Sequence, residues 1–237
     1  MRKLAVFDID NTLAKPGRAI SQNVTKKLRK LQNMGVKIAL ISGKPVSYIA
    51  GFARGAGLED VLIAGENGGV ILNPATLEVR YLKKRPRSLD IIEKHVKRKF
   101  ATKIWLQPNE VILTIFPRRP VKVDGVEKYV WEVIKRNHLR DVFVYTHVDA
   151  IDVMPQGLNK GLAVKYFCEF LEVPREHVAT VGDSESDIPM FESSGFSIVV
   201  GYKNEKARSK ALITVNEATS AIDVLIKRAK GRSKWSK

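Results

Sequence analysis

Short continuous runs of apolar residues alternate along much of the chain with segments of helical periodicity. The runs have the length and composition of strands buried on both faces of a sheet, and they lie at residues 4–7, 36–41, 61–64, 178–181 and 197–200. Segments between them carry apolar residues at helical spacing, as Val24, Leu28 and Leu31 do. Alternating strands and helices predict an α/β fold, with a doubly wound, mostly parallel sheet that has helices on both faces.

Capping and turn residues refine these boundaries. Ser21 is suited to cap a helix that ends at Gly35. Further helices are predicted over residues 47–54, 160–171, 188–192 and 220–229. Residues 70–72 and 79–82 have the pattern of a hairpin, for which Asn73-Pro74 supplies the turn.

The composition changes at Lys83, where a basic stretch interrupted by proline follows the hairpin. We predict that residues 83–154 form an inserted domain, and that residues 1–82 and 155–237 form the core domain. The pattern within the insert predicts helices at 91–100 and 126–138 and strands at 111–116, 142–145 and 150–154. The insert is therefore expected to be a smaller α+β module.

Composition places the chain among ordinary globular proteins. Its 237 residues are 44% apolar, and Cys168 is the only cysteine, so no disulfide can form within the chain. A single thiol fits a reducing compartment, and we expect a cytoplasmic protein. No stretch approaches the roughly 18 apolar residues that span a bilayer, so no membrane partner is expected. The basic residues from Gly231 onward are expected to fray.

The formal net charge of +16 requires an anionic partner class to be considered. Such an excess is found in proteins that bind nucleic acids, membrane surfaces or anionic substrates. The basic residues are dispersed along the chain, and Trp105, Trp131 and Trp235 do not form a stacking stripe for bases. We interpret the charge as a surface that steers small anions, with nucleic-acid binding as the less favoured alternative.

Three predicted strands run directly into polar residues at their carboxyl ends. Residues 5–7 lead into Asp8 and Asp10, residues 39–41 into Ser42 and Gly43, and residues 179–181 into Gly182 and Asp183. In open α/β sheets, ligands bind outside the carboxyl ends of the strands, so these groups should converge on one crevice. Lys160 begins the helix that precedes the third of these strands and can point into the same place.

Up to four carboxylates would meet in this crevice, from Asp8, Asp10, Asp183 and Asp187. Their mutual repulsion would force some of them to take up protons unless a cation were present. Hard oxygen ligands that leave room for water and a phosphate suit Mg²⁺. The sequence therefore predicts a magnesium site.

The neighbouring residues suit a phosphoryl group. Ser42 and the backbone N–H groups around Gly43 can cradle phosphate oxygens, and Lys160 adds a positive charge. Asp8, at the strand end, is the candidate nucleophile that would form an aspartyl-phosphate. Asp10 can give a proton to the leaving oxygen and later take one from the attacking water.

These residues, in this order, resemble the motifs of the haloacid dehalogenase superfamily. The stretch from Asp8 to Leu13, Asp-Ile-Asp-Asn-Thr-Leu, resembles the first motif, and Ser42-Gly43 the second. Lys160 resembles the third motif, and the stretch from Gly182 to Asp187 the fourth. The resemblance covers the predicted core and departs from the family pattern at Asn11 and Ser186, where glycine and asparagine are commoner.

The resemblance implies a role for each of these residues. Asp8 would be the nucleophile and Asp10 the general acid and base, with Thr12 supporting their loop. Ser42, Gly43 and Lys160 would bind phosphate. Mg²⁺ would be held by Asp8, Asp10, Asp183 and Asp187, the last two directly or through water.

The place of the insert and the stretch Glu66-Asn67-Gly68-Gly69 resemble the subfamily that has an α/β cap. The size is similar to that of archaeal phosphoglycolate phosphatases and the sucrose-phosphate phosphatase-like group. We expect a Mg²⁺-dependent phosphomonoester hydrolase that acts on a small metabolite through a phospho-Asp8 intermediate, with phosphoglycolate as the first choice. The alternatives are a sugar-phosphate phosphatase or a phosphomutase on the same scaffold, and a homodimer is left open.

Arg118 and Arg119 follow a predicted strand of the insert and suit a carboxylate, although a solvated loop is an equal alternative. If Arg118 binds a substrate carboxylate when the cap closes, Arg118→Ala should raise KM for an acidic phosphate ester much more than for a neutral one. Steady-state kinetics on one ester of each kind measure the difference. Equal changes in the two KM values would remove the support for this role.

Overall fold

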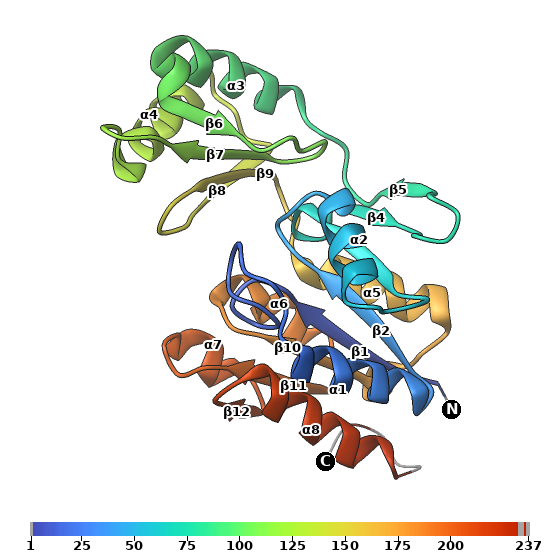
Figure 1. Ribbon diagram of the computed structural model, residues 1–237. Coiled ribbons are helices and arrows are strands. Elements are labelled where there is room, and N and C mark those ends of the chain that lie inside the picture. The colour runs from blue at the N-terminus through green and yellow to red at the C-terminus, as the bar shows by residue number, and fades with distance from the viewer. Residues whose placement is uncertain (1, 232–234, 236–237) are drawn as a thin grey trace. The chain divides into compact units, whose positions relative to one another are not determined.

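The computed structural model describes residues 2–231 and residue 235, and it divides into two compact units (Figure 1). The first unit is Met1–Leu82 with Asn159–Lys237, and the second is Lys83–Leu158. The predicted insert has the same first residue as the second unit but ends at residue 154 instead of Leu158.

The first unit contains an eight-stranded sheet in the order β12-β11-β10-β1-β2-β3-β4-β5. Its strands are β1 (Lys3–Asp8), β2 (Val36–Ile41), β3 (Leu62–Gly65), β4 (Val70–Leu72), β5 (Val79–Tyr81), β10 (Val178–Gly182), β11 (Phe196–Val200) and β12 (Ile213–Val215). Neighbouring strands from β12 to β3 pair in parallel, whereas β4 and β5 add an antiparallel edge. This architecture confirms the predicted α/β fold class.

Helices cover both faces of this sheet. They are α1 (Gln22–Asn33), α2 (Val46–Gly55), α5 (Lys160–Leu171), α6 (Ile188–Glu192), α7 (Glu205–Lys210) and α8 (Ala218–Ala229). The strands β1, β2 and β3 advance along the sheet in one direction, and β10, β11 and β12 advance in the other. Right-handed crossovers therefore place α1 and α2 on one face and α6 and α7 on the opposite face.

Local sequence accounts for where two of these helices begin. The Ser21 hydroxyl accepts a hydrogen bond from the Val24 backbone N–H at 3.2 Å, as expected of an N-cap before α1. The Asn159 side chain accepts one from the Gly161 N–H at 3.0 Å at the start of α5. This second cap sets the position of Lys160, the first residue of α5.

Alternate residues of the strands bury their side chains beneath α5 and α6. Leu4 and Val6 of β1 pack with Val164 and Phe167 of α5 and with Met190 of α6 in one continuous apolar cluster. Fully burying side chains of this size contributes roughly 1.5–3 kcal/mol each, so this cluster anchors α5 firmly on the sheet.

The second unit pairs a four-stranded antiparallel sheet, in the order β6-β7-β9-β8, with two helices. Its elements are α3 (Arg87–Phe100), β6 (Ile104–Leu106), β7 (Leu113–Pro117), α4 (Val123–Arg136), β8 (Val142–Thr146) and β9 (Ile151–Pro155). Ile115 of β7 and Val153 of β9 share a buried cluster with Ile92 of α3 and Val130 of α4. One face of the sheet therefore carries both helices, in an α+β module.

Several short elements have no counterpart in the sequence-based prediction. These are β6, α7 and β12, together with the 3₁₀ turns η1 (Glu66–Gly68), η2 (Ala101–Lys103), η3 (Arg175–His177) and η4 (Glu185–Asp187). Segments of three to six residues give a weak periodic signal, so the hydrophobic pattern revealed some of them, such as residues 70–72 and 188–192, and missed others.

The prediction of a frayed tail is wrong for Trp235, and residues 232–234 and 236–237 lie outside the described part. The Trp235 side chain is fully buried, and its backbone N–H donates to the Glu176 carbonyl at 2.8 Å. The Arg228 guanidinium donates to the Trp235 carbonyl at 2.8 Å. Burial of a large aromatic ring therefore outweighs the basic composition of this segment.

Among the helices of the described residues, none combines the length and the apolar character needed to cross a bilayer.

Candidate active site

The candidate site lies where the strand order of the large sheet reverses, between β1 and β10. These two strands pair in parallel, with Phe7 opposite Val181. Asp8 is the last residue of β1, and Asp183 directly follows β10. Crossovers run to opposite faces on either side of this point, which leaves a crevice at the carboxyl ends of the two strands.

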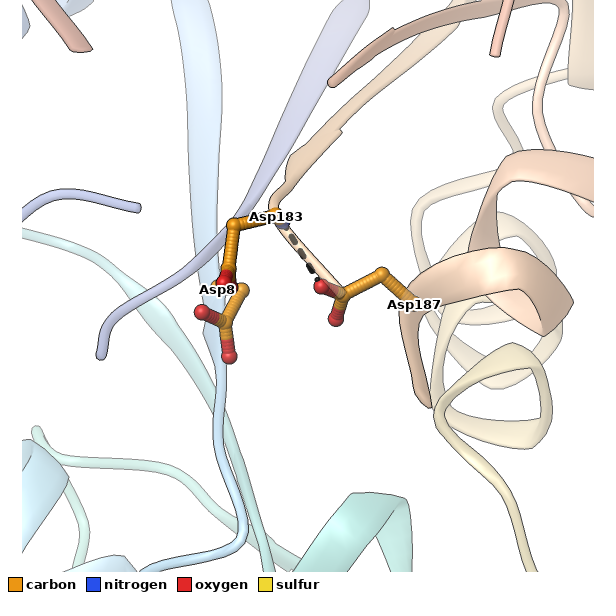
Figure 2. Close-up of side chains that lie close together, drawn as sticks. All are labelled: Asp8, Asp183 and Asp187. Atoms are coloured by element: carbon orange, nitrogen blue, oxygen red, sulfur yellow. Dashed lines mark hydrogen bonds between the residues drawn. The ribbon is translucent and has the colours of Figure 1, made fainter. Parts of the chain in front are cut away.

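Three of the predicted carboxylates meet here. Asp8, Asp183 and Asp187 each contribute an oxygen to a group in which these oxygens lie within 4.8 Å of one another (Figure 2). The Asp8 side chain comes from β1, and the other two come from the turn after β10. Asp8 is 4% exposed and Asp187 is fully buried, so little water screens their charges.

Asp187 organises the turn that carries Asp183. Its Oδ2 atom accepts hydrogen bonds from the backbone N–H of Asp183 at 2.9 Å and of Ser184 at 3.0 Å, and from the Ser184 hydroxyl at 3.2 Å. Figure 2 shows the first of these bonds. Asp187 therefore fixes the backbone from which Asp183 projects.

Lys160 joins the two sides of the crevice. Its Nζ donates to Asp8 Oδ1 at 2.7 Å and to Asp187 Oδ1 at 2.6 Å, and the lysine is 4% exposed. Burial alone would lower the pKa of Lys160, but the Asp187 and Asp8 carboxylates outweigh it and raise that pKa above its usual value. Lys160 is therefore a permanent positive charge in the site.

One lysine does not balance three carboxylates. Burial, together with the Asp187 and Asp183 charges, raises the pKa of Asp8 to about 8 despite the attraction of Lys160. Burial and Asp187 likewise raise the pKa of Asp183 to about 6. The ionised site thus lacks positive charge.

The carboxylate group fits a divalent cation. The donors are hard oxygens, which suit Mg²⁺, and a cation beside them would favour their ionised forms. Asp187 is fully buried and its Oδ2 atom already accepts from three hydrogen-bond donors, whereas Asp8 is 4% exposed and Asp183 is half-buried. Asp8, Asp183 and Asp187 are therefore the candidates for holding such a cation, and their metal-binding roles stay predictions.

The remaining residues of the first motif lie in the loop after β1. Thr12 is buried, and its hydroxyl donates to Asp183 Oδ1 at 3.3 Å, which ties the two acidic loops together. Asp10 is half-buried and does not belong to the group of three carboxylates. Its roles as a metal ligand and as the general acid and base stay predictions.

Ser42 follows β2 at the same edge of the sheet. It is buried, its backbone N–H donates to the Ala64 carbonyl at 3.1 Å, and its hydroxyl accepts from the Lys44 N–H at 3.2 Å. The loop that includes Gly43 is therefore held against the end of β3. Phosphate binding by Ser42 and Gly43 stays a prediction.

Arg118 and His147 lie in the second unit, and each has a partner there. Arg118 is exposed after β7, and its guanidinium donates to the Thr102 carbonyl at 3.5 Å. His147 Nε2 lies 3.0 Å from the buried carboxylate of Asp152. The Arg118 substrate role therefore remains a prediction, and His147 has a structural partner.

Sequence reasoning missed two residues on which the acidic turn depends. The Ser184 hydroxyl caps this turn, and Gly182 lies so close to Asp187 that a Cβ at position 182 would come within 2.5 Å of Asp187 Cγ. The spacing of Ser184 and Asp187 is that of a capping box, which could have indicated the first. Gly182 begins the stretch that resembles the fourth motif, but its close approach to Asp187, which requires a glycine, is visible only in the folded chain.

Gly182→Ala should displace Asp187, since the added methyl group would overlap its carboxylate. Overpacking of this kind costs roughly 1–3 kcal/mol of unfolding free energy, and the variant should also lose activity. Urea unfolding measures the first effect. The matched control is Gly125→Ala in α4, where a Cβ meets no atom within 4 Å and about 0.5–1 kcal/mol should be gained. Equal stability of the two variants would contradict this account.

The raised pKa values also predict how stability depends on pH without metal. The ordinary carboxyl pKa is about 4, so folded Asp8 and Asp183 hold protons that the unfolded chain has lost. Their contribution is full below about pH 4 and is lost as the pH rises to about 8. In EDTA, the melting temperature of the wild type relative to Asp183→Asn should therefore fall between pH 5 and pH 8.

Mg²⁺ binds ionised carboxylates, so it should raise the wild-type melting temperature more at pH 8 than at pH 5. Thermal melts with EDTA or excess Mg²⁺ at the two pH values measure both effects. A Mg²⁺-induced shift of the same size in Asp183→Asn would show that the cation binds elsewhere.

The sequence of this chain is similar to those of a known protein family and of several relatives. The model of the haloacid dehalogenase-like hydrolases matches residues 5–113 and 128–223. A phosphoglycolate phosphatase of Pyrobaculum islandicum is 30% identical over 218 residues, which cover 91% of this chain and 90% of the relative. One of Methanothrix thermoacetophila is 29% identical over 221 residues, which cover 92% of each.

Solved structures share the fold. A haloacid dehalogenase-like hydrolase from Bacteroides thetaiotaomicron has a TM-score of 0.81 at 20% identity, over 94% of this chain and 99% of that one. A sugar phosphatase of subclass IIB of the superfamily has a TM-score of 0.73 at 18% identity, over 96% and 98%. The chain therefore belongs to the haloacid dehalogenase-like hydrolases, as the motifs from Asp8 to Asp187 had indicated.

Proposed function

We propose that this enzyme, a phosphatase, hydrolyses phosphoglycolate in a Mg²⁺-dependent reaction that passes through phospho-Asp8. The observation that carries the proposal is the buried contact of Lys160 with Asp8 and Asp187, at a strand end where Asp183 also lies. Relatives named phosphoglycolate phosphatase, aligned over about nine-tenths of both chains, support the choice of substrate.

We infer that Asp8 acts as the nucleophile. In the first step, an oxygen of its carboxylate forms a bond to phosphorus while the bond from phosphorus to the alcohol oxygen breaks. The leaving oxygen takes a proton from Asp10. Lys160, which donates to Asp8 Oδ1, holds the nucleophile in one orientation before attack.

Water completes the reaction. Asp10, now ionised, takes a proton from a water molecule. The oxygen of that water forms a bond to phosphorus, and the bond from phosphorus to the Asp8 oxygen breaks. Inorganic phosphate leaves, and both carboxyl groups return to their first state. The same residue thus serves as acid and then as base.

The charge on the phosphoryl group is stabilised from two sides. We infer that the Ser42 hydroxyl and the backbone N–H of Gly43 donate to phosphate oxygens, and that the Lys160 ammonium adds its positive charge. Mg²⁺, when bound, would neutralise charge on the phosphate and on the carboxylates. Asp8 and Asp183 would hold it, with Asp10 and Asp187 completing the predicted set directly or through water.

The alternative substrates differ from phosphoglycolate in a way that one assay separates. A sugar-phosphate phosphatase would prefer esters without a carboxylate, and a phosphomutase would return an isomeric ester instead of free phosphate. Phosphate release from a panel of phosphorylated metabolites with Mg²⁺ tests all three. We expect the highest kcat/KM for phosphoglycolate. A higher kcat/KM for another ester would refute phosphoglycolate as the substrate but would still support hydrolysis of a phosphate ester.

The phospho-Asp8 step has its own test. Asp8→Asn removes the nucleophilic oxygen and should lower kcat by about a thousandfold or more, while the fold is retained. Asp223→Asn is the control, because Asp223 only forms a surface ion pair with Lys27 and should keep the wild-type rate. Phosphate release and circular dichroism measure the two properties. Turnover at the native rate by Asp8→Asn would refute the mechanism.

A further inference from the structure

The turn between β3 and β4 has an unusual backbone. Glu66, Asn67 and Gly68 have φ angles of +53°, +55° and +92°. Asparagine and glycine tolerate this left-handed region better than other residues do, but three in succession are rare. Residues held in sparsely populated regions cost of order 1–3 kcal/mol each, and such strain clusters at functional sites.

One side of this turn presses against the loop that carries Ser42 and Gly43. The backbone N–H of Glu66 donates to the Lys44 carbonyl, and that of Asn67 to the Ser42 carbonyl, both at 3.0 Å. A Cβ at Gly65 would lie 2.7 Å from the Lys44 carbonyl oxygen, so only glycine permits this approach.

The other side of the turn presses against the first turn of α5. A Cβ at Gly68 would lie 3.0 Å from the Asn159 carbonyl oxygen and 3.4 Å from Lys160 Cα. The strained turn therefore lies between two elements proposed to bind phosphate, the loop at Ser42 and Gly43 and the helix that begins with Lys160.

The Asn67 side chain contacts Gly43, and the left-handed backbone at Asn67 does not require this contact. Asn67 is 8% exposed, and its amide lies over Gly43, so that a Cβ at position 43 would be 3.4 Å from Asn67 Oδ1 and 3.6 Å from Nδ2. A residue chosen only for its left-handed backbone could equally be glycine. The asparagine side chain instead fills the space beside the Gly43 backbone.

We propose that Asn67 is a positioning residue for phosphate, whose side-chain amide holds the Gly43 backbone in the conformation that presents its N–H, and the Ser42 hydroxyl, to the phosphoryl group. The inference rests on the proposed phosphatase function. In this role Asn67 does not contact the phosphate itself. It acts by holding the Gly43 backbone, whose N–H is proposed to bind the phosphate.

Asn67→Gly separates this role from a purely structural one. Glycine adopts a φ of +55° without strain, which offsets the cost of removing a buried side chain, so the melting temperature should change little. Loss of the amide should let the loop shift, and a misplacement of about 1 Å can cost about a hundredfold in rate. We expect kcat/KM to fall at least about tenfold and the dissociation constant of inorganic phosphate, measured by calorimetry with Mg²⁺, to rise at least about threefold.

Two further variants complete the experiment. Leu77→Gly is the matched control, because Leu77 has a φ of +59° and is 72% exposed in the β4–β5 turn; it should keep wild-type kinetics and phosphate affinity. Asn67→Asp keeps the size and backbone tolerance of asparagine but replaces the amide NH₂ and adds negative charge. It should also fold and should bind phosphate more weakly than the wild type.

The outcomes distinguish this inference from the proposed function. Asn67→Gly with wild-type kcat/KM and phosphate affinity would overturn the inference, and so would a fall in melting temperature large enough to unfold the variant under the assay conditions, which would mark the side chain as structural. Wild-type protein that releases phosphate from no ester would reject the proposed function, but the calorimetric comparison would still test Asn67. A wild type that fails to bind inorganic phosphate at all would overturn both.

Discussion

The buried ammonium of Lys160 is the interaction on which the site depends. It contacts Asp8 and Asp187 at hydrogen-bonding distance, and all three side chains are nearly or fully buried. Moving each such charge out of water costs several kcal/mol, which is tolerable only because the charges compensate one another. Three carboxylates against one ammonium still leave two uncompensated negative charges when all are ionised. A divalent cation carries two positive charges. One lysine and one such ion would therefore neutralise the three carboxylates.

The topology of the sheet makes this arrangement achievable. Residues 8, 160 and 183 are far apart in sequence, but the strand order reverses between β1 and β10, and both strands end at the same edge. The clusters beneath α5 anchor the helix that begins with Lys160. Rigid elements therefore hold the charged groups, while the loops that follow Asp8, Ser42 and Asp183 remain available for ligands. The left-handed turn at Asn67 adds a brace between two of these elements.

Sequence predicted the parts of this molecule that depend on periodicity and on strand ends. The runs at 36–41 and 160–171 are the strand β2 and the helix α5 with the same bounds, because their apolar patterns are long enough to be read. The strand-end rule correctly predicted that Asp8 and Asp183 lie close together. Short elements such as β6 carried no period, and the role of Gly182 depends on a contact that only the folded chain makes. Burial of Trp235 likewise follows from tertiary packing, although the segment that carries this residue is basic in composition.

The charge of the site and the charge of the whole chain have opposite signs, and this has a consequence for binding. The chain carries +16, which attracts anions over distances of about a Debye length, roughly 8–10 Å at physiological salt. At the end of that approach, a phosphate dianion would meet the ionised carboxylates of Asp8 and Asp183, which repel it. Surface attraction therefore raises the local concentration of substrate without by itself making the site receptive. Charge balance among Asp8, Asp183, Asp187 and Lys160 is thus a condition for phosphate binding, and protonation or a divalent cation can meet it. Only the cation also leaves Asp8 ionised, as a nucleophile must be, so the same physical requirement links metal binding to chemistry.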